Sequence, residues 1–101
     1  MLFRSNGEAN PLDGEFYIGS ADWMDRNLSR RVEAVTPVSA RNLRERLWED
    51  LVVQLEDRRN AWQMQPDGSY VQLHAAKGDS KVAREGTHVT HMKRTRARFR
   101  R

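Results

Sequence analysis

A glycine and a serine that follow a predicted strand are the first residues whose types suit chemistry. Gly19 has no side chain, so the backbone can bend sharply there and a ligand can approach closely. The next backbone N–H groups and the Ser20 hydroxyl can point at one anion, and Asp22 can accept a hydrogen bond from a histidine or an arginine. Planar cationic donors suited to phosphate oxygens follow closely, and they are Arg26, Arg30 and Arg31. The stretch is a candidate phosphate-facing loop.

The same residues also allow a structural interpretation. Gly19-Ser20 is typical of a turn, and Arg30 and Arg31 can pair with neighbouring carboxylates. The residue types by themselves leave both interpretations open.

Three predicted strands surround this loop. Residues 2–4 and 15–18 are rich in β-formers, and the Asn6-Gly7 pair between them suits a turn with positive φ. These two segments predict an antiparallel hairpin with a long tip. Apolar and polar residues alternate over residues 30–38, which predicts a third strand that ends at Pro37.

A long amphipathic helix is predicted over about residues 40–63. Leucines recur every four residues from Leu43 to Leu55, which is a helical period. Trp48 and Trp62 fall on the same side, so both tryptophans are expected to pack in the core. A turn over residues 65–68 and a short strand over 69–73 follow.

Electric charge is distributed unevenly along the chain. Residues 1–73 carry a net charge of −3 and residues 74–101 a net charge of +7. A basic segment favours polyanions such as nucleic acid, polyphosphate or anionic lipid, and a solvated terminus is the alternative. A polar linker is predicted over residues 75–86, and Thr87 is the candidate cap of a last helix over about 87–100.

Composition excludes several classes of function. The absence of cysteine excludes disulfides, thiolate metal sites and cysteine nucleophiles. His88 and His91 are three residues apart, but two ligands without a third are weak evidence for a metal site, and the nearby cations repel a metal ion. We expect no metal. No apolar run approaches the roughly 18 residues of a membrane span, so we expect a cytoplasmic location.

One motif resembles a known family. Residues 18–33 read IGSADWMDRNLSRRVE, which is similar to the C-terminal catalytic domain of polyphosphate kinases. Members typically carry IGSADWM, one residue, RNL, one residue and RRVE. Residues 3–20 resemble the family's preceding hairpin, residues 43–73 resemble its following helix and strand, and residues 86–101 match less closely.

The resemblance implies a reaction and a fold. The family moves the terminal phosphoryl group of ATP to a polyphosphate chain through a phosphohistidine, and it requires magnesium. Its C-terminal domains are built like phospholipase D halves, each with a histidine motif and a glycine-serine loop. Gly19, Ser20 and Asp22 match that loop, with Asp22 where phospholipases usually have asparagine. The implied role of Ser20 and Asp22 is to orient the histidine or hold phosphate oxygens. Electrostatic support for the transfer would come from Arg26, Arg30 and Arg31.

The family's catalytic histidines have no counterpart here. The resemblance places them upstream of Met1, together with the ATP- and magnesium-binding residues, and neither His74 nor the His88/His91 pair matches a catalytic position. We expect a C-terminal fragment that binds neither ATP nor magnesium and is inactive alone. Its expected partners are the remainder of the kinase and, in a full-length homo-oligomer, ATP and polyphosphate. Membrane association is expected only through that full-length enzyme.

These elements predict an α+β fold. Residues 1–74 would form part of a phospholipase D-like domain, with a small antiparallel or mixed sheet packed on one long helix. Residues 75–101 would form a basic tail or helix. The alternative function is a small basic module that binds RNA or polyphosphate, with an affinity that falls steeply with salt. A phospholipase D-like phosphodiesterase would need a histidine-lysine motif, which the sequence lacks.

Overall fold

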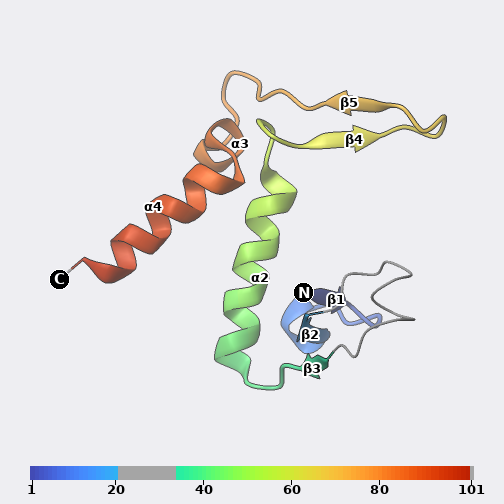
Figure 1. The fold of residues 1–101 in the computed structure, drawn as a ribbon, viewed down its shortest axis with the longest axis vertical. Coiled ribbons are helices and arrows are strands. Elements are labelled where there is room, and N and C mark those ends of the chain that lie inside the picture. Colours follow the sequence, from blue (N-terminus) through green and yellow to red (C-terminus); the bar gives the residue numbers. More distant parts are fainter. Residues whose placement is uncertain (21–33, 101) are drawn as a thin grey trace. The chain divides into compact units, whose positions relative to one another are not determined.

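The computed structural model describes residues 1–20 and 34–100 (Figure 1). The chain forms two compact units, Met1–Trp48 and Glu49–Arg101. The first unit contains a three-stranded sheet and the beginning of a long helix. The second contains the end of that helix, a two-stranded sheet and two shorter helices. The architecture is α+β with small antiparallel sheets, as the sequence predicts.

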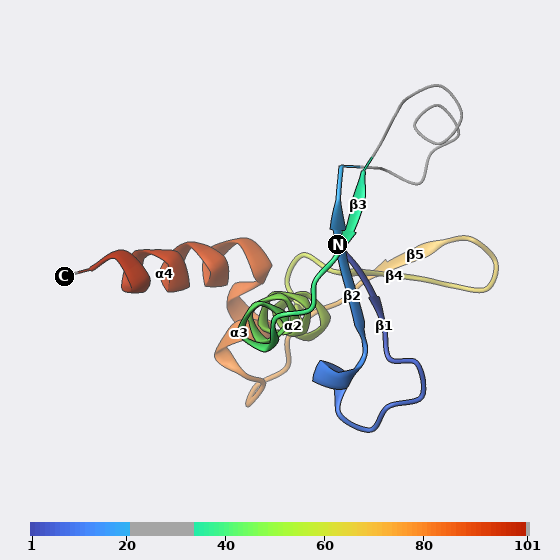
Figure 2. The ribbon, with the colours of Figure 1, turned by 90° about the horizontal axis from the view of Figure 1, so that it is seen from below.

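Three short strands form the sheet of the first unit, in the order β1 (Leu2–Arg4), β2 (Glu15–Gly19) and β3 (Val35–Pro37). Both pairings are antiparallel. The β1–β2 hairpin, which can be followed in Figure 2, confirms the sequence prediction. Its turn has Asn6 at φ 54° and Gly7 at φ 80°, left-handed values that this residue pair adopts readily.

The third strand is confirmed only in its described part. It ends at Pro37 as predicted, while residues 30–33 lie outside the described residues. Because β3 is an edge strand, it can accommodate a proline that donates no backbone hydrogen bond.

Aromatic rings form the core of the first unit. The side chain of Phe16 on β2 is 1% exposed. The Phe3 ring lies 4.9 Å from that of Phe16 and 5.0 Å from that of Trp48 on α2 (Arg41–Glu56). The predicted packing of Trp48 is therefore confirmed, and it joins the hairpin to the helix.

Arg44 fastens the beginning of α2 to the chain that precedes it. Its Nε donates to the carbonyl of Val38 at 2.8 Å, and a terminal nitrogen donates to the carbonyl of Leu12 at 3.1 Å. Leu12 lies in a short 3-10 helix, η1 (Pro11–Asp13), at the tip of the first hairpin. One guanidinium thus satisfies two carbonyls from different segments.

The predicted extent of the long helix is wrong at its C-terminal end. The helix ends at Glu56 rather than near residue 63. The Asp57 carboxylate then accepts hydrogen bonds from the N–H groups of Arg59 and Asn60, both at 2.8 Å. This side-chain turn competes with further helical hydrogen bonds, and no glycine or proline marks the break in the sequence.

Trp62 lies on a strand, not on the helix. It belongs to β4 (Trp62–Met64), which pairs antiparallel with β5 (Tyr70–Gln72), and its side chain is 59% exposed. The predicted core packing of Trp62 is therefore wrong. The predicted strand over 69–73 is confirmed as β5, and the predicted turn joins it to β4 with Gly68 at φ 86°.

Two helices complete the second unit. The predicted linker contains α3 (Lys81–Glu85), so that part of the prediction is wrong, whereas the last helix is confirmed as α4 (Thr87–Phe99). The predicted cap is also wrong, because Gly86 occupies the cap position at φ 86°. No helix in the described ranges is long and apolar enough to cross a membrane.

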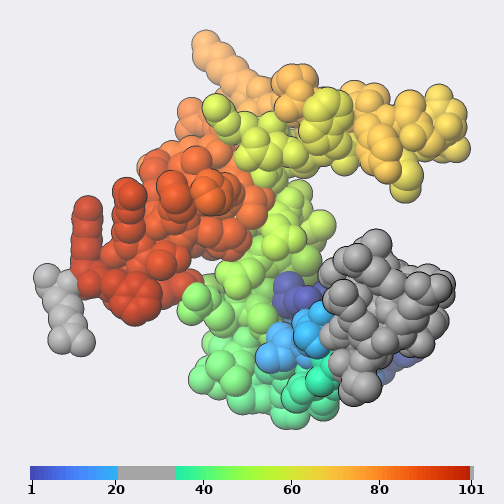
Figure 3. All heavy atoms as spheres, in the orientation of Figure 1, coloured from blue at the N-terminus to red at the C-terminus, as the bar shows by residue number. Residues whose placement is uncertain are grey.

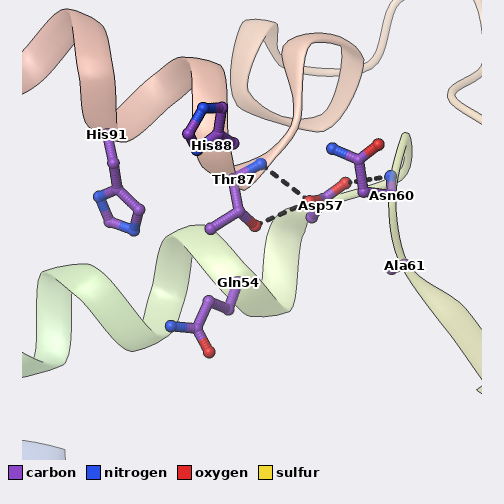
Figure 4. A pocket seen from close by; sticks show the side chains of 7 residues that line it. All are labelled: Gln54, Asp57, Asn60, Ala61, Thr87, His88 and His91. Carbon is purple, nitrogen blue, oxygen red and sulfur yellow. Dashed lines mark hydrogen bonds between the residues drawn. The ribbon is translucent and has the colours of Figure 1, made fainter.

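Asp57 connects the end of α2 to the beginning of α4 (Figure 4). One carboxylate oxygen accepts from the Arg59 and Asn60 amides, and the other accepts from the Thr87 N–H at 2.8 Å and the Thr87 hydroxyl at 2.7 Å. Asp57 is 4% exposed. Burial raises the pKa of Asp57, but the bonds from Asn60, Thr87 and Arg59 outweigh burial and lower the pKa to about 2. The anion also lies at the positive end of the α4 dipole.

Replacing this carboxylate with an amide tests its contribution. We expect Asp57→Asn to lower the free energy of unfolding by about 2 kcal/mol, because the amide nitrogen would face groups that donate. The folded-state pKa is depressed, so the contribution is present above the unfolded value of about 4 and is lost as pH falls toward 2.

Urea unfolding of the wild type and the variant at several pH values measures this difference. The gap between the two should be constant above about pH 5 and should shrink toward pH 2. Asp79→Asn is the control, because this carboxylate bonds only an exposed turn. A gap that persists unchanged at pH 2 would contradict the assignment.

Candidate functional site

The end of β2 and the beginning of β3 hold the two ends of the motif segment together. Gly19 is paired with Val35. The Ser20 N–H donates to the Ala34 carbonyl at 3.1 Å, and the Ala34 N–H donates to the Ser20 hydroxyl oxygen at 3.4 Å. Residues 20 and 34 are therefore adjacent, and the segment between them begins and ends at one point on the sheet.

Gly19 is required by the close approach of β3. A Cβ atom at this position would lie 2.5 Å from the Ala34 carbonyl oxygen and 3.1 Å from the Val35 Cα atom. Real Cβ atoms do not approach a backbone oxygen this closely, so a side chain would displace the strand. Close approach of a ligand to this glycine remains a prediction, because the neighbour that the structure describes is protein backbone.

Two of the six candidate site residues lie in the described part of the chain. Gly19 and Ser20 are together at the exposed end of β2, and the Ser20 hydroxyl helps to close the β2–β3 pair. The other four lie outside the described residues, and their roles remain predictions; they are Asp22, Arg26, Arg30 and Arg31.

The second unit contains an open hollow that the sequence analysis did not identify. It has a volume of about 450 Å³ and lies beside the Asp57–Thr87 contact. His91, on its wall, has Nδ1 3.7 Å from an Asp50 carboxylate oxygen. The Asp57 oxygens are already used by four donors, so they hold the fold rather than offer a ligand site. The lining residues are Gln54, Asp57, Asn60, Ala61, Thr87, His88 and His91.

The metal-ligating residue types are dispersed in the described residues. Nowhere in residues 1–20 and 34–100 do three His, Asp or Glu side chains gather in a way that could hold a metal ion. The useful sequence signal for the Asp57 contact was the Gly86-Thr87 pair. It marks a helix beginning with no acidic residue in its first turn, so its free N–H groups need an acceptor from another segment or from water.

The comparisons identify the family. The family model described as polyphosphate kinase C-terminal domain 2 matches residues 2–84. The polyphosphate kinase of Thermosynechococcus vestitus is 48% identical over 95 residues, which cover 94% of this chain and 12% of the relative. The polyphosphate kinase of Parasynechococcus marenigrum is 60% identical over 65 residues, covering 64% of this chain and 9% of the relative. The polyphosphate kinase of Neisseria meningitidis serogroup B is 42% identical over 81 residues, which cover 79% of this chain and 11% of the relative.

The chain belongs to the polyphosphate kinase C-terminal domain 2 family. It spans about a tenth of the length of the curated relatives, all of which carry the name of an enzyme. No solved structure matches the chain significantly. The resemblance stated from the IGSADWM motif is confirmed at the level of the family.

A single methyl group at position 19 tests the geometry of the β2–β3 pair. We expect Gly19→Ala to destabilise the first unit by about 1–3 kcal/mol, because the new Cβ must displace Ala34. Hydrogen exchange of the Ser20 amide, which donates to Ala34, should become faster. Thr36→Ala on exposed β3 is the control with little expected effect. Undiminished protection of the Ser20 amide in Gly19→Ala would refute the close-approach argument.

Proposed function

We propose that this chain acts as part of the catalytic region of a polyphosphate kinase. The full enzyme would transfer the terminal phosphoryl group of ATP to inorganic polyphosphate through a phosphohistidine. The observation that carries the proposal is the family match over residues 2–84, with relatives named polyphosphate kinase that are 42–60% identical to it. The matched residues cover only 9–12% of these relatives, so we also propose that this chain is inactive alone.

We propose further that the first unit corresponds to part of a phospholipase D-like half. The support is the position of the glycine-serine pair. Gly19 ends the central strand of the sheet and Ser20 follows it, and both face the beginning of β3. Hydrogen bonds with Ala34 fix the position of Ser20 on the sheet, which suits a residue that must orient a catalytic group.

The motif segment would supply the electrostatic part of the reaction. Phosphoryl transfer depends mainly on positioning and on stabilising charge on the transferred group. In this proposal Ser20 and Asp22 orient the active-site histidine or hold phosphate oxygens. The phosphate charge would be stabilised by guanidinium groups, which are planar double donors. These groups belong to Arg26, Arg30 and Arg31. The contact between residues 20 and 34 would keep the ends of this segment together during turnover.

ATP and magnesium are assigned to the full enzyme. The resemblance places the family's magnesium ligands in the rest of a longer kinase, so the proposal assigns none to this chain. The nucleophilic histidine would likewise come from the rest of a longer kinase, which we propose works as a homo-oligomer. Because ATP is used in the cytoplasm, the proposal places the enzyme there.

A graft into a relative tests this function. The segment of the Thermosynechococcus vestitus polyphosphate kinase that matches this chain would be replaced by this chain, and ATP-dependent polyphosphate synthesis measured. The graft should be active, and the 101-residue chain alone should not. Within the graft, Asp22→Asn and Arg30→Gln should each lower kcat about 100-fold, as removal of one stabilising group typically does.

The matched control is Arg46→Gln, which removes a cation from an exposed position of α2 without touching the motif. It should leave kcat unchanged. A folded graft that retains full activity with both Asp22→Asn and Arg30→Gln would refute the assigned roles. Synthesis by the isolated chain would refute its proposed inactivity.

A further inference from the structure

The last helix, α4, carries basic side chains and no acidic ones. The ammonium group of Lys93 is 2.6 Å from a Glu85 carboxylate oxygen, so this cation is neutralised within the unit. In the part of the chain that the structure describes, no carboxylate forms an ion pair with the remaining cations of this segment, which are Arg94, Arg96, Arg98 and Arg100.

Two large apolar side chains lie open to water among these cations. Phe99 is 81% exposed and Met92 is 42% exposed, and every residue from 92 to 100 is exposed. At 3.6 residues per turn, Met92, Arg96 and Phe99 fall along one side of the helix. Folding of the described residues leaves this combination of ring and guanidinium groups without a structural role.

The family model does not include this helix, although the match to the Thermosynechococcus vestitus relative extends into it. The match to the model ends at residue 84, whereas α4 begins at Thr87. The family model, which covers residues 2–84, therefore assigns no role to this helix. Figure 3 shows side chains of this C-terminal segment projecting from the surface. A function of α4 can be considered independently of the proposed transfer reaction.

We propose that α4 binds single-stranded RNA, with its arginines on the phosphates and the Phe99 ring against a base. A single strand presents both anionic groups and flat apolar faces. Proteins that bind such strands combine a cationic surface with aromatic side chains on which bases stack. The arginines of α4 match the first feature, and the exposed Phe99 ring matches the second.

Two other polyanions explain less of the surface. Inorganic polyphosphate carries charge but no flat apolar group, so it uses the arginines and leaves Phe99 exposed. An anionic membrane needs a wide apolar helix face, whereas polar Thr95 and cationic Arg96 separate Met92 from Phe99. The exposed ring is the observation that favours RNA.

Binding of the whole 101-residue chain to a fluorescent 12-nucleotide oligouridylate tests the proposal, with a 12-phosphate polyphosphate as competitor. The affinity should fall with salt, with a logarithmic slope of about −3 for four phosphate contacts. Phe99→Leu should weaken RNA binding about fivefold or more, as the loss of one stacked base does, and leave polyphosphate competition unchanged. Phe99→Tyr, which keeps the ring, should bind RNA as the wild type does.

The cationic part is tested by the double variant Arg96→Gln/Arg98→Gln. It should reduce the salt slope by about half and weaken binding of both polyanions. Its control is Arg46→Gln/Lys77→Gln, which removes the same charge from exposed positions outside α4 and should bind RNA as the wild type does. Far-UV circular dichroism checks the helical content of every variant.

Three results would overturn the proposal. The first is no binding of oligouridylate at 50 mM salt. The second is equal affinity for oligouridylate and polyphosphate, together with a Phe99→Leu variant that changes neither affinity or changes both equally. That result would mean that charge attraction alone explains the binding. The third is tighter binding to vesicles with one-third phosphatidylglycerol than to oligouridylate. If Phe99→Leu unfolds, the comparison between Phe99→Tyr and Phe99→Ala decides in its place.

Discussion

A single buried carboxylate, that of Asp57, holds the helices of the second unit together. Asp57 uses one oxygen to end α2 and the other to begin α4, with four donors between 2.7 and 2.8 Å. A buried anion is costly unless it is fully hydrogen-bonded. Three of its donors here are backbone N–H groups that a turn or a helix end would otherwise leave unsatisfied, and the fourth is the Thr87 hydroxyl. The same hydrogen bonds therefore offset both the cost of burying the charge and the cost of the open helix end.

A second constraint acts in the first unit, through the absence of a side chain. The approach of β3 leaves no room for a Cβ at Gly19, and the Ser20–Ala34 contacts continue that pair beyond the strand. The glycine-serine pair of the family motif thus has a role in the sheet as well as a proposed one in catalysis. The Ser20–Ala34 contacts connect the fold to the proposed function, because they fix both ends of the motif segment on the sheet.

The two proposals depend on different parts of the chain. The kinase proposal uses the family-matched residues and the sheet of the first unit. The RNA proposal uses an arginine-rich helix beyond the residues that the family model covers, where positive charge and one exposed ring occur together. Since the second is independent of phosphoryl transfer, either can hold without the other.

The sequence by itself determined the features that depend on neighbouring residues. The Asn6-Gly7 hairpin, the strands at its sides, the end of β3 at Pro37 and the packed Trp48 all follow from local pattern and turn chemistry, and the IGSADWM motif identified the family. Of the candidate site, the sequence supplied the residues, and the structure showed why position 19 is glycine.

The tertiary structure decided where α2 ends, that Trp62 lies on an exposed strand, and how α4 is capped. Each depends on Asp57, or on the turn that it forms, and two of its four donors come from a residue thirty positions away. Helical periodicity continued through Leu55 to Trp62 in the sequence, because a pattern of apolar residues records local spacing only. A hydrogen bond to a distant segment leaves no such period, so the break became visible only in the folded chain.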